Sequence, residues 1–182
     1  HYQVQQDLES DRVRGMEALA RLHCAELGNI SPFEFIRIAE YTGLIVPLGN
    51  LVLRNACFQG KKWLDSGFYI GKLSVNISVN QLRNDTFYDD VCRIVNETGF
   101  PYELLELEIT ESVFLDHSDE NTEILSKLRD LGISIALDDF GTGYSSLNYL
   151  TVLPIDTLKI DKSFLGKSLD ELSHTEIIKT II

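Results

Sequence analysis

LLELEIT (residues 104–110) and ISIALDDF (133–140) decide the fold of this chain, because each is a short apolar segment that carries acidic residues toward its end. A similar segment, KLSVNIS (72–78), precedes them, and the three recur at intervals of roughly thirty residues with helical patterns between them. Strands and helices that alternate in this way predict βα units and a parallel sheet. DTLKID (156–161) predicts a further strand.

The N-terminal part predicts two strands followed by two helices. HYQVQQ (1–6) and GMEALARL (15–22) indicate adjacent strands joined by a loop. Ser31 and Pro32 are typical of a helix start, and Gly43 is typical of its end. A longer helix is expected from about Pro47 to Asp65, and its predicted buried stripe comprises Leu48, Leu51, Val52, Ala56 and Trp63.

The strand count indicates part of a barrel. About six strands can be identified, whereas a closed β/α barrel has eight and typically needs about 250 residues. The chain has 182 residues and stops within an apparent helix, HTEIIKTII (174–182). We therefore expect it to be a piece of a longer protein whose C-terminal portion is missing here.

Composition narrows the function classes. The chain has 16 basic and 28 acidic residues, a net charge of −12, which argues against binding to duplex nucleic acid. A small phosphate ligand stays compatible with this charge, because local cations or metal ions can offset it. Three widely spaced cysteines without a CxxC pair favour the reducing cytoplasm. No apolar run is long enough to span a bilayer, although the parent protein could be membrane-anchored.

Polar side chains gather at the C-terminal ends of the predicted strands, which is where ligands bind in parallel sheets and barrels. Adjacent carboxylates, Asp138 and Asp139, cannot both face one site along a regular strand, but they can where the strand ends in a turn. Their mutual repulsion then favours cations between them. The alternative is that the string DDFG (138–141) is only a solvated turn.

The polar side chains at the ends of the predicted strands are mainly oxygen donors, and oxygen donors favour Mg²⁺ or Mn²⁺ over zinc or copper. Lys159 and Asp161 lie two residues apart on the next strand, so both can face the same site. The lysine is either a structural counter-ion or a group that orients a nucleophilic water, and the residue pattern leaves both open. The oxygen donors at the strand ends are Glu17, Asn76, Glu108, Asp138 and Asp139.

The ordered motifs resemble the EAL domain family of cyclic di-GMP phosphodiesterases over the whole chain. Glu17-Ala18-Leu19 matches the naming motif, with Arg21 at the family's arginine position. The resemblance implies an α/β fold, a modified TIM-type (β/α)8 barrel with an irregular first strand. It also implies that residues 1–182 form one such domain that lacks about two βα units. The other matching motifs are SPFEFIRIAEYTGLIVPLG (31–49), LSVNIS (73–78), LELEITES (105–112), IALDDFGTGYSSL (135–147) and LPIDTLKID (153–161).

The same resemblance implies a role for each site residue. Glu17, Asn76, Glu108 and Asp138 would ligate one metal, and Asp138 with Asp139 would contribute to a second. Lys159 and Asp161 would hold the attacking water. Gln3, Leu19 and Arg21 would bind substrate, with Arg21 on a phosphate. Glu111 would brace the loop after Asp139, and the loop residues Gly141, Thr142, Gly143 and Ser145 would help to stabilise it.

The implied reaction is metal-dependent hydrolysis of cyclic di-GMP to linear pGpG. The resemblance further implies a homodimer, and sensory or GGDEF domains elsewhere in the parent chain. The main alternative is an inactive cyclic di-GMP receptor or protein-interaction module. An unrelated metal enzyme on a barrel is a third possibility, because fold alone does not establish function.

Overall fold

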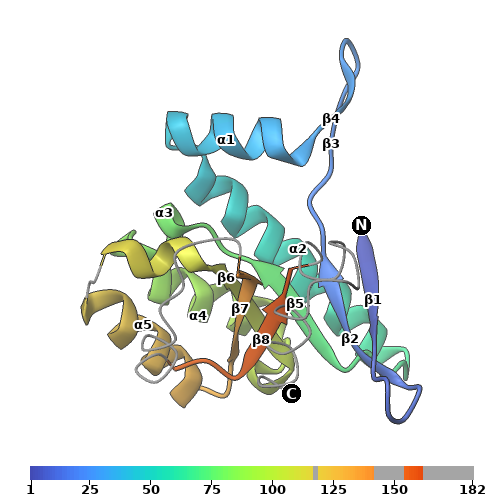
Figure 1. Cartoon of the computed structure of the whole chain (residues 1–182). Coiled ribbons are helices and arrows are strands. Elements are labelled where there is room, and N and C mark those ends of the chain that lie inside the picture. Colours follow the sequence, from blue (N-terminus) through green and yellow to red (C-terminus); the bar gives the residue numbers. More distant parts are fainter. Residues whose placement is uncertain (117–118, 142–153, 162–182) are drawn as a thin grey trace, which may run out of the picture.

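A curled six-stranded sheet is the centre of the molecule (Figure 1). The computed structural model describes residues 1–116, 119–141 and 154–161. The sheet has the order β1 (Tyr2–Gln6), β2 (Val13–Ala18), β5 (Lys72–Asn76), β6 (Leu105–Thr110), β7 (Ser134–Phe140) and β8 (Thr157–Ile160). Within this sheet the strands from β2 to β8 run parallel to one another, and β1 pairs antiparallel with β2 at one edge.

The alternation of side chains along β6 explains the two faces of the sheet. Leu105, Leu107 and Ile109 are fully buried among the hydrophobic residues of the core. The core also includes side chains of α2 (Ile45–Asp65), α4 (Phe87–Thr98) and α5 (Asp119–Asp130). Glu106 and Glu108 lie on the opposite face and are also buried. The outer face of β6 is therefore apolar, and its inner face carries carboxylates.

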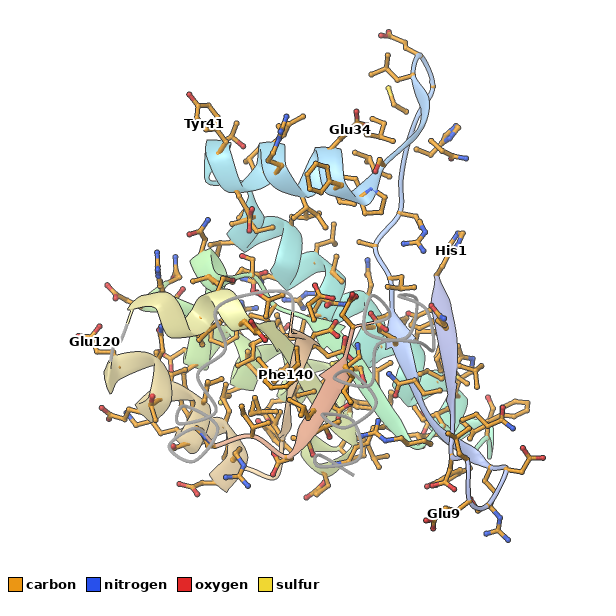
Figure 2. The ribbon with its side chains drawn as sticks, viewed as in Figure 1. His1, Glu9, Glu34, Tyr41, Glu120 and Phe140 are labelled. Atoms are coloured by element: carbon orange, nitrogen blue, oxygen red, sulfur yellow. The ribbon has the colours of Figure 1, made fainter. Side chains whose placement is uncertain are left out.

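Helices cover the outer face of the sheet. The predicted helix start at Ser31-Pro32 is confirmed, and Gly43 ends that helix in the left-handed conformation, with φ 76°. Phe140 lies in the centre of the molecule, whereas Tyr41 projects outward from α1 (Figure 2). The helices are α1 (Pro32–Thr42), α2 (Ile45–Asp65), α3 (Val79–Leu82), α4 (Phe87–Thr98) and α5 (Asp119–Asp130), with short 3-10 turns at Tyr102–Leu104 and Glu111–Asp116.

The buried stripe predicted for α2 is confirmed only in part, since Ala56 is buried and Val52 and Trp63 pack against the core. Leu51 is 53% exposed, and Leu48, Val52 and Trp63 are only partly buried. The helix instead buries a side that includes Gly49, where a Cβ atom would come within 1.8 Å of the Gln81 side chain. Small residues on this side allow the close approach, and a pattern that counts only large apolar residues misses them.

The strand predictions are confirmed within the described residues, including the parallel pairing from β5 to β8. One element was missed, a separate hairpin of β3 (Leu22–Cys24) and β4 (Gly28–Ile30) (Figure 1). The helix expected in residues 174–182 lies outside the described residues. None of the helices in the described ranges combines the length and apolar character that crossing a bilayer requires.

Candidate active site

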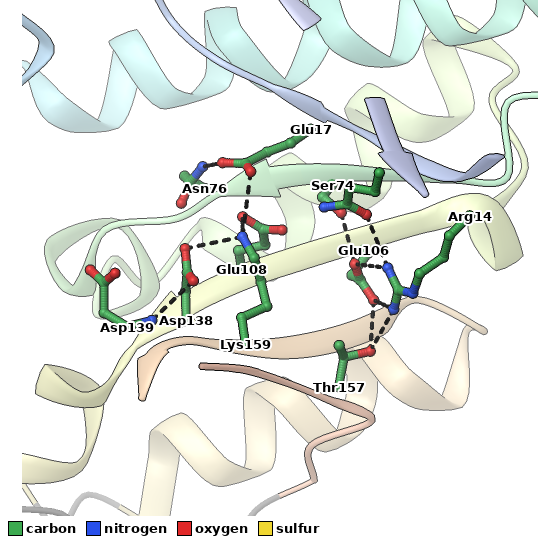
Figure 3. A network of polar contacts seen from close by, with 11 residues as sticks. Arg14, Glu17, Ser74, Asn76, Glu106, Glu108, Asp138, Asp139, Thr157 and Lys159 are labelled. Atoms are coloured by element: carbon green, nitrogen blue, oxygen red, sulfur yellow. Dashed lines mark hydrogen bonds and ion pairs between the residues drawn. The ribbon is translucent and has the colours of Figure 1, made fainter. Parts of the chain in front are cut away.

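Five of the predicted site residues meet at the C-terminal ends of the parallel strands (Figure 3). Neighbouring strands bring Asn76 level with Glu108, and the Asn76 amide donates to Glu17 Oε1 at 2.8 Å. The remaining two residues of this group, Asp138 and Lys159, come from β7 and β8. Strand order therefore assembles side chains that lie far apart in the sequence.

Lys159 is the centre of this cluster. Its ammonium lies 2.7 Å from Glu108 Oε2, 3.1 Å from Asp138 Oδ2 and 3.4 Å from Glu17 Oε2. One cation on β8 thus ties together carboxylates from β2, β6 and β7. The counter-ion interpretation of Lys159 has direct geometric support in these contacts.

Burial and charge set the protonation behaviour of the cluster. Burial raises the pKa of Glu108 to about 7, although the hydrogen bond and charge of Lys159 oppose the rise. Burial works against the charged form of Lys159, but its bond to Glu108 and the nearby carboxylates raise its pKa to about 12. The lysine therefore stays charged near neutral pH, whereas Glu108 can exchange a proton there.

A bulge within β7 allows the adjacent carboxylates of Asp138 and Asp139 to lie on the same side of the strand. The pairing passes from Leu137 opposite Leu158 to Phe140 opposite Ile160, so β7 has two residues where β8 has only Lys159. Asp139 adopts a left-handed φ of 54°. Both carboxylates project to the same side of the strand in Figure 3. The expected turn is thus a bulge, with β7 continuing to Phe140.

Asp139 and Asp161 lie close to one another beside this bulge. Burial, and then the charges of Asp138 and Asp161, raise the pKa of Asp139. Asp161 follows directly after β8, and its backbone N–H donates to Phe140 O at 3.5 Å. The carboxylate of Asp161 is consequently part of the same electrostatic environment.

Glu111 contacts the start of the loop that it was expected to brace. Its Oε1 atom accepts a hydrogen bond of 2.6 Å from the backbone N–H of Gly141. The predictions for Thr142, Gly143 and Ser145 lie outside the described residues.

The predicted substrate residues lie outside the Lys159 cluster, and two of them line a separate cleft. Gln3 pairs with Glu17 across the β1–β2 ladder, which places both on the same face of the sheet. Leu19 and Arg21 line a cleft of about 1390 Å³ between the hairpin, α1 and α2. Arg21 makes a hydrogen bond of 2.7 Å to Ala20 O, and its exposed side chain lies outside the Lys159 cluster.

A second polar group, which was not predicted, lies on the inner face of the sheet. Glu106 is buried and accepts hydrogen bonds from Arg14, Ser74 and Thr157 (Figure 3). The available signal was a period of two, because Glu106, Ser74 and Thr157 each precede a predicted site residue by two positions.

Known proteins are similar to this chain over its whole length. The model of the EAL domain family matches residues 1–182. Over 182 residues the chain is 39% identical to the Escherichia coli (strain K12) protein named cyclic di-GMP phosphodiesterase PdeR, covering all of this chain and 27% of that protein. It is 37% identical over 182 residues to the Pseudomonas aeruginosa protein named cyclic di-GMP phosphodiesterase NbdA, covering all of this chain and 23% of that protein.

The fold agrees with the same family. A solved structure of the PaMucR phosphodiesterase in complex with c-di-GMP superposes with a TM-score of 0.91 at 38% identity, covering all of this chain and 73% of that one. The chain spans only 20–27% of the length of three similar curated relatives.

Proposed function

Because the chain belongs to the EAL domain family, we propose that it is a phosphodiesterase domain that hydrolyses cyclic di-GMP to linear pGpG. The observation that carries this proposal is the Lys159 cluster, in which carboxylates from separate strands converge at the C-terminal ends of the parallel strands. Residues 1–182 would form most of a modified (β/α)8 barrel in a longer signalling protein. Sensory or GGDEF domains would accompany it in the parent chain, in the cytoplasm.

The donor set fits a hard divalent cation such as Mg²⁺ or Mn²⁺. As the side chains are placed, no three Asp, Glu, His or Cys residues in the described ranges form a ready metal site, since the carboxylates surround Lys159 instead. Glu108 Oε1, however, is buried and has no hydrogen-bond partner within the described part of the chain. Such an atom is costly unless a cation or donor meets it.

We assign the ligand roles accordingly. Glu17, Asn76, Glu108 and Asp138 would hold one metal, and Asp138 with Asp139 would contribute to a second. Bound divalent cations would supply an activated water near neutral pH and would offset the negative charge that develops on the phosphate.

The protein side chains would orient the reactants. Lys159 and Asp161 would hold the attacking water, with Lys159 kept charged by its carboxylate neighbours. Arg21 would bind a phosphate through its planar set of donors, and Gln3 and Leu19 would contact the dinucleotide. Glu111 would hold Gly141 and thereby the loop that follows it. A homodimer with an isologous contact near this loop is the proposed assembly.

The test is hydrolysis of cyclic di-GMP by the full-length protein, with pGpG measured by chromatography. Mg²⁺ or Mn²⁺ should support turnover, and Ca²⁺, which coordinates more loosely, should support binding with little turnover. Equal activity in excess chelator would contradict the metal mechanism. Tight binding without turnover at saturating Mn²⁺ would favour the receptor alternative.

A further inference from the structure

A second ion pair lies on the inner face of the sheet, next to the candidate active site (Figure 3). Glu106 is 1% exposed, and Arg14 Nη2 lies 3.3 Å from its Oε2 atom. The Thr157 hydroxyl donates to Glu106 Oε2 at 2.9 Å and accepts from Arg14 Nη2 at 3.1 Å. Ser74 donates to Glu106 Oε1 at 2.7 Å. These contacts join β2, β5, β6 and β8 through side chains.

A β-bulge directs Arg14 into this position. Gln5 pairs with Gly15, but Gln6 pairs with Val13, so Arg14 is the extra residue in β2. A bulge changes the direction of a side chain, and the guanidinium also reaches Gln5 Oε1 at 3.0 Å. A Cβ atom at Gly15 would come within 2.6 Å of Lys72 O, which accounts for a glycine beside the arginine. The bulge and the neighbouring Gly15 therefore favour the position from which Arg14 pairs with Glu106.

The ion pair lies one step along the strands from the site residues. Side chains two positions apart on a strand share a face, so Glu106 accompanies Glu108 on β6 and Thr157 accompanies Lys159 on β8. The backbone ladder between β7 and β8 is irregular opposite Lys159. Backbone pairing on that side therefore leaves the position of Lys159 less constrained, and Thr157 provides a second attachment of β8 to β6 and β2.

We propose that Arg14, Glu106 and Thr157 form a positioning bridge that sets the separation of Glu17, Glu108 and Lys159. The bridge touches neither metal nor substrate in this proposal, and it acts through the strands that carry the three site residues. The inference rests on the proposed function for its consequences, since those residues are assigned there to metal and water. A merely structural ion pair would affect the free energy of unfolding and leave metal affinity unchanged.

The test replaces Thr157 by valine, which keeps the side-chain shape and removes the hydroxyl that joins Glu106 and Arg14. Measurements on the full-length protein give the Tm, the Kd for Mn²⁺ from the electron paramagnetic resonance of free Mn²⁺, and kcat and KM for cyclic di-GMP. Residues that orient metal ligands typically change metal affinity or activity by roughly 10- to 100-fold when replaced, and we expect a change of this size in Kd and kcat. KM should change little.

Ser134→Ala is the matched control, because it removes a hydroxyl from the start of β7 that bonds Lys72 at 2.7 Å. It should leave Mn²⁺ affinity and kcat unchanged. Arg14→Lys is the second variant, which keeps the charge but loses the two-pronged contact, and it should weaken Mn²⁺ binding in the same direction.

Each outcome decides the inference. A lower Tm of Thr157→Val with unchanged Mn²⁺ affinity and unchanged kcat would overturn the bridge, as would an equal effect of Ser134→Ala. If the unaltered protein binds Mn²⁺ but does not hydrolyse cyclic di-GMP, the proposed function fails while the Mn²⁺ affinities still decide the bridge. A protein that binds no Mn²⁺ would overturn both.

Discussion

Lys159 Nζ lies 2.7 Å from Glu108 Oε2, and this contact joins the central lysine of the described cluster to the most buried of its three carboxylates. Glu108 is 1% exposed and carries a second oxygen that has no hydrogen-bond partner in the described ranges. Two roles for Lys159 follow from the same geometry. It can neutralise the carboxylates, or it can orient a water that attacks the phosphate.

Lys159→Met separates these roles. If Lys159 orients the water, the variant should lose about 100-fold or more in kcat at saturating Mn²⁺, with little change in the Kd for cyclic di-GMP, because the lost contact acts mainly in the transition state. Single-turnover hydrolysis and calorimetric binding provide the two numbers.

Recovery of most of the rate by excess Mn²⁺ would contradict the water-orienting role and support the counter-ion role. Lys72→Met is the control, because Lys72 also lies in a parallel strand, yet its ammonium bonds Glu103 O and Ser134 Oγ instead of the carboxylate cluster. It should leave kcat unchanged.

The sheet could be predicted from the sequence because its strands combine apolar outer residues with polar ends at a regular spacing. Helix faces were harder to predict. α2 buries Gly49 and Gly60, where close packing depends on the absence of a side chain, and a pattern based on large apolar residues selects Leu48 and Leu51 instead. The β3–β4 hairpin has strands of only three residues each, too short for a periodic signal.

Which site residues converge could be predicted, since residues at the carboxyl ends of neighbouring parallel strands meet at one edge. The backbone bulges that bring these side chains together could not be predicted. Asp139 reaches its position through a bulge and a left-handed φ, which depend on the register between β7 and β8. The Arg14–Glu106 pair also depends on a bulge, and residue order alone assigns Arg14 to the wrong face.

Leu107→Ala should destabilise the domain by about 2–5 kcal/mol, because it opens a cavity in a tightly packed core. Leu107 is 1% exposed and points to the helix side of β6. Leu51→Ala on α2 is the control, since Leu51 is 53% exposed, and its cost should stay below about 1 kcal/mol. Denaturant titration measures both, and equal losses would show that the core does not lie between β6 and the helices.

Asp90→Asn should remove part of the acid sensitivity of folding. The hydrogen bond from Arg93 is the largest cause of the lowered pKa of Asp90, and Asn50 on α2 adds a donor at 3.0 Å. A lowered folded-state pKa means that ionised Asp90 stabilises the fold above the ordinary value of 3.8, and this stability is lost as the pH falls through the folded-state value.

The Asp90→Asn variant should therefore be less stable than the unaltered chain by about 1 kcal/mol at pH 7 and should lose less of its stability on acidification. Tm measured from pH 7 to pH 2 tests this expectation. Asp89→Asn removes the same charge from the same turn of α4, so a matching pH profile in that variant would attribute the effect to helix charge instead of the hydrogen bonds from Arg93 and Asn50.

Glu17→Ala should abolish turnover of cyclic di-GMP while leaving the fold intact. Glu17 lies near the C-terminal end of β2 and accepts a hydrogen bond from Asn76. Its Oε2 atom lies 3.4 Å from Lys159 Nζ. Removing it deletes a proposed metal ligand at the edge of the cluster but creates no cavity in the apolar core. We expect kcat to fall by at least about 1000-fold, which corresponds to roughly 4 kcal/mol of transition-state stabilisation. The Tm should change by only a few degrees, because the large core residues on the other face of the sheet are untouched.

Glu34→Ala, on the outer helix α1, should change neither quantity. Global unfolding of Glu17→Ala would mark the residue as structural, and full activity of the folded variant would remove Glu17 from the metal site.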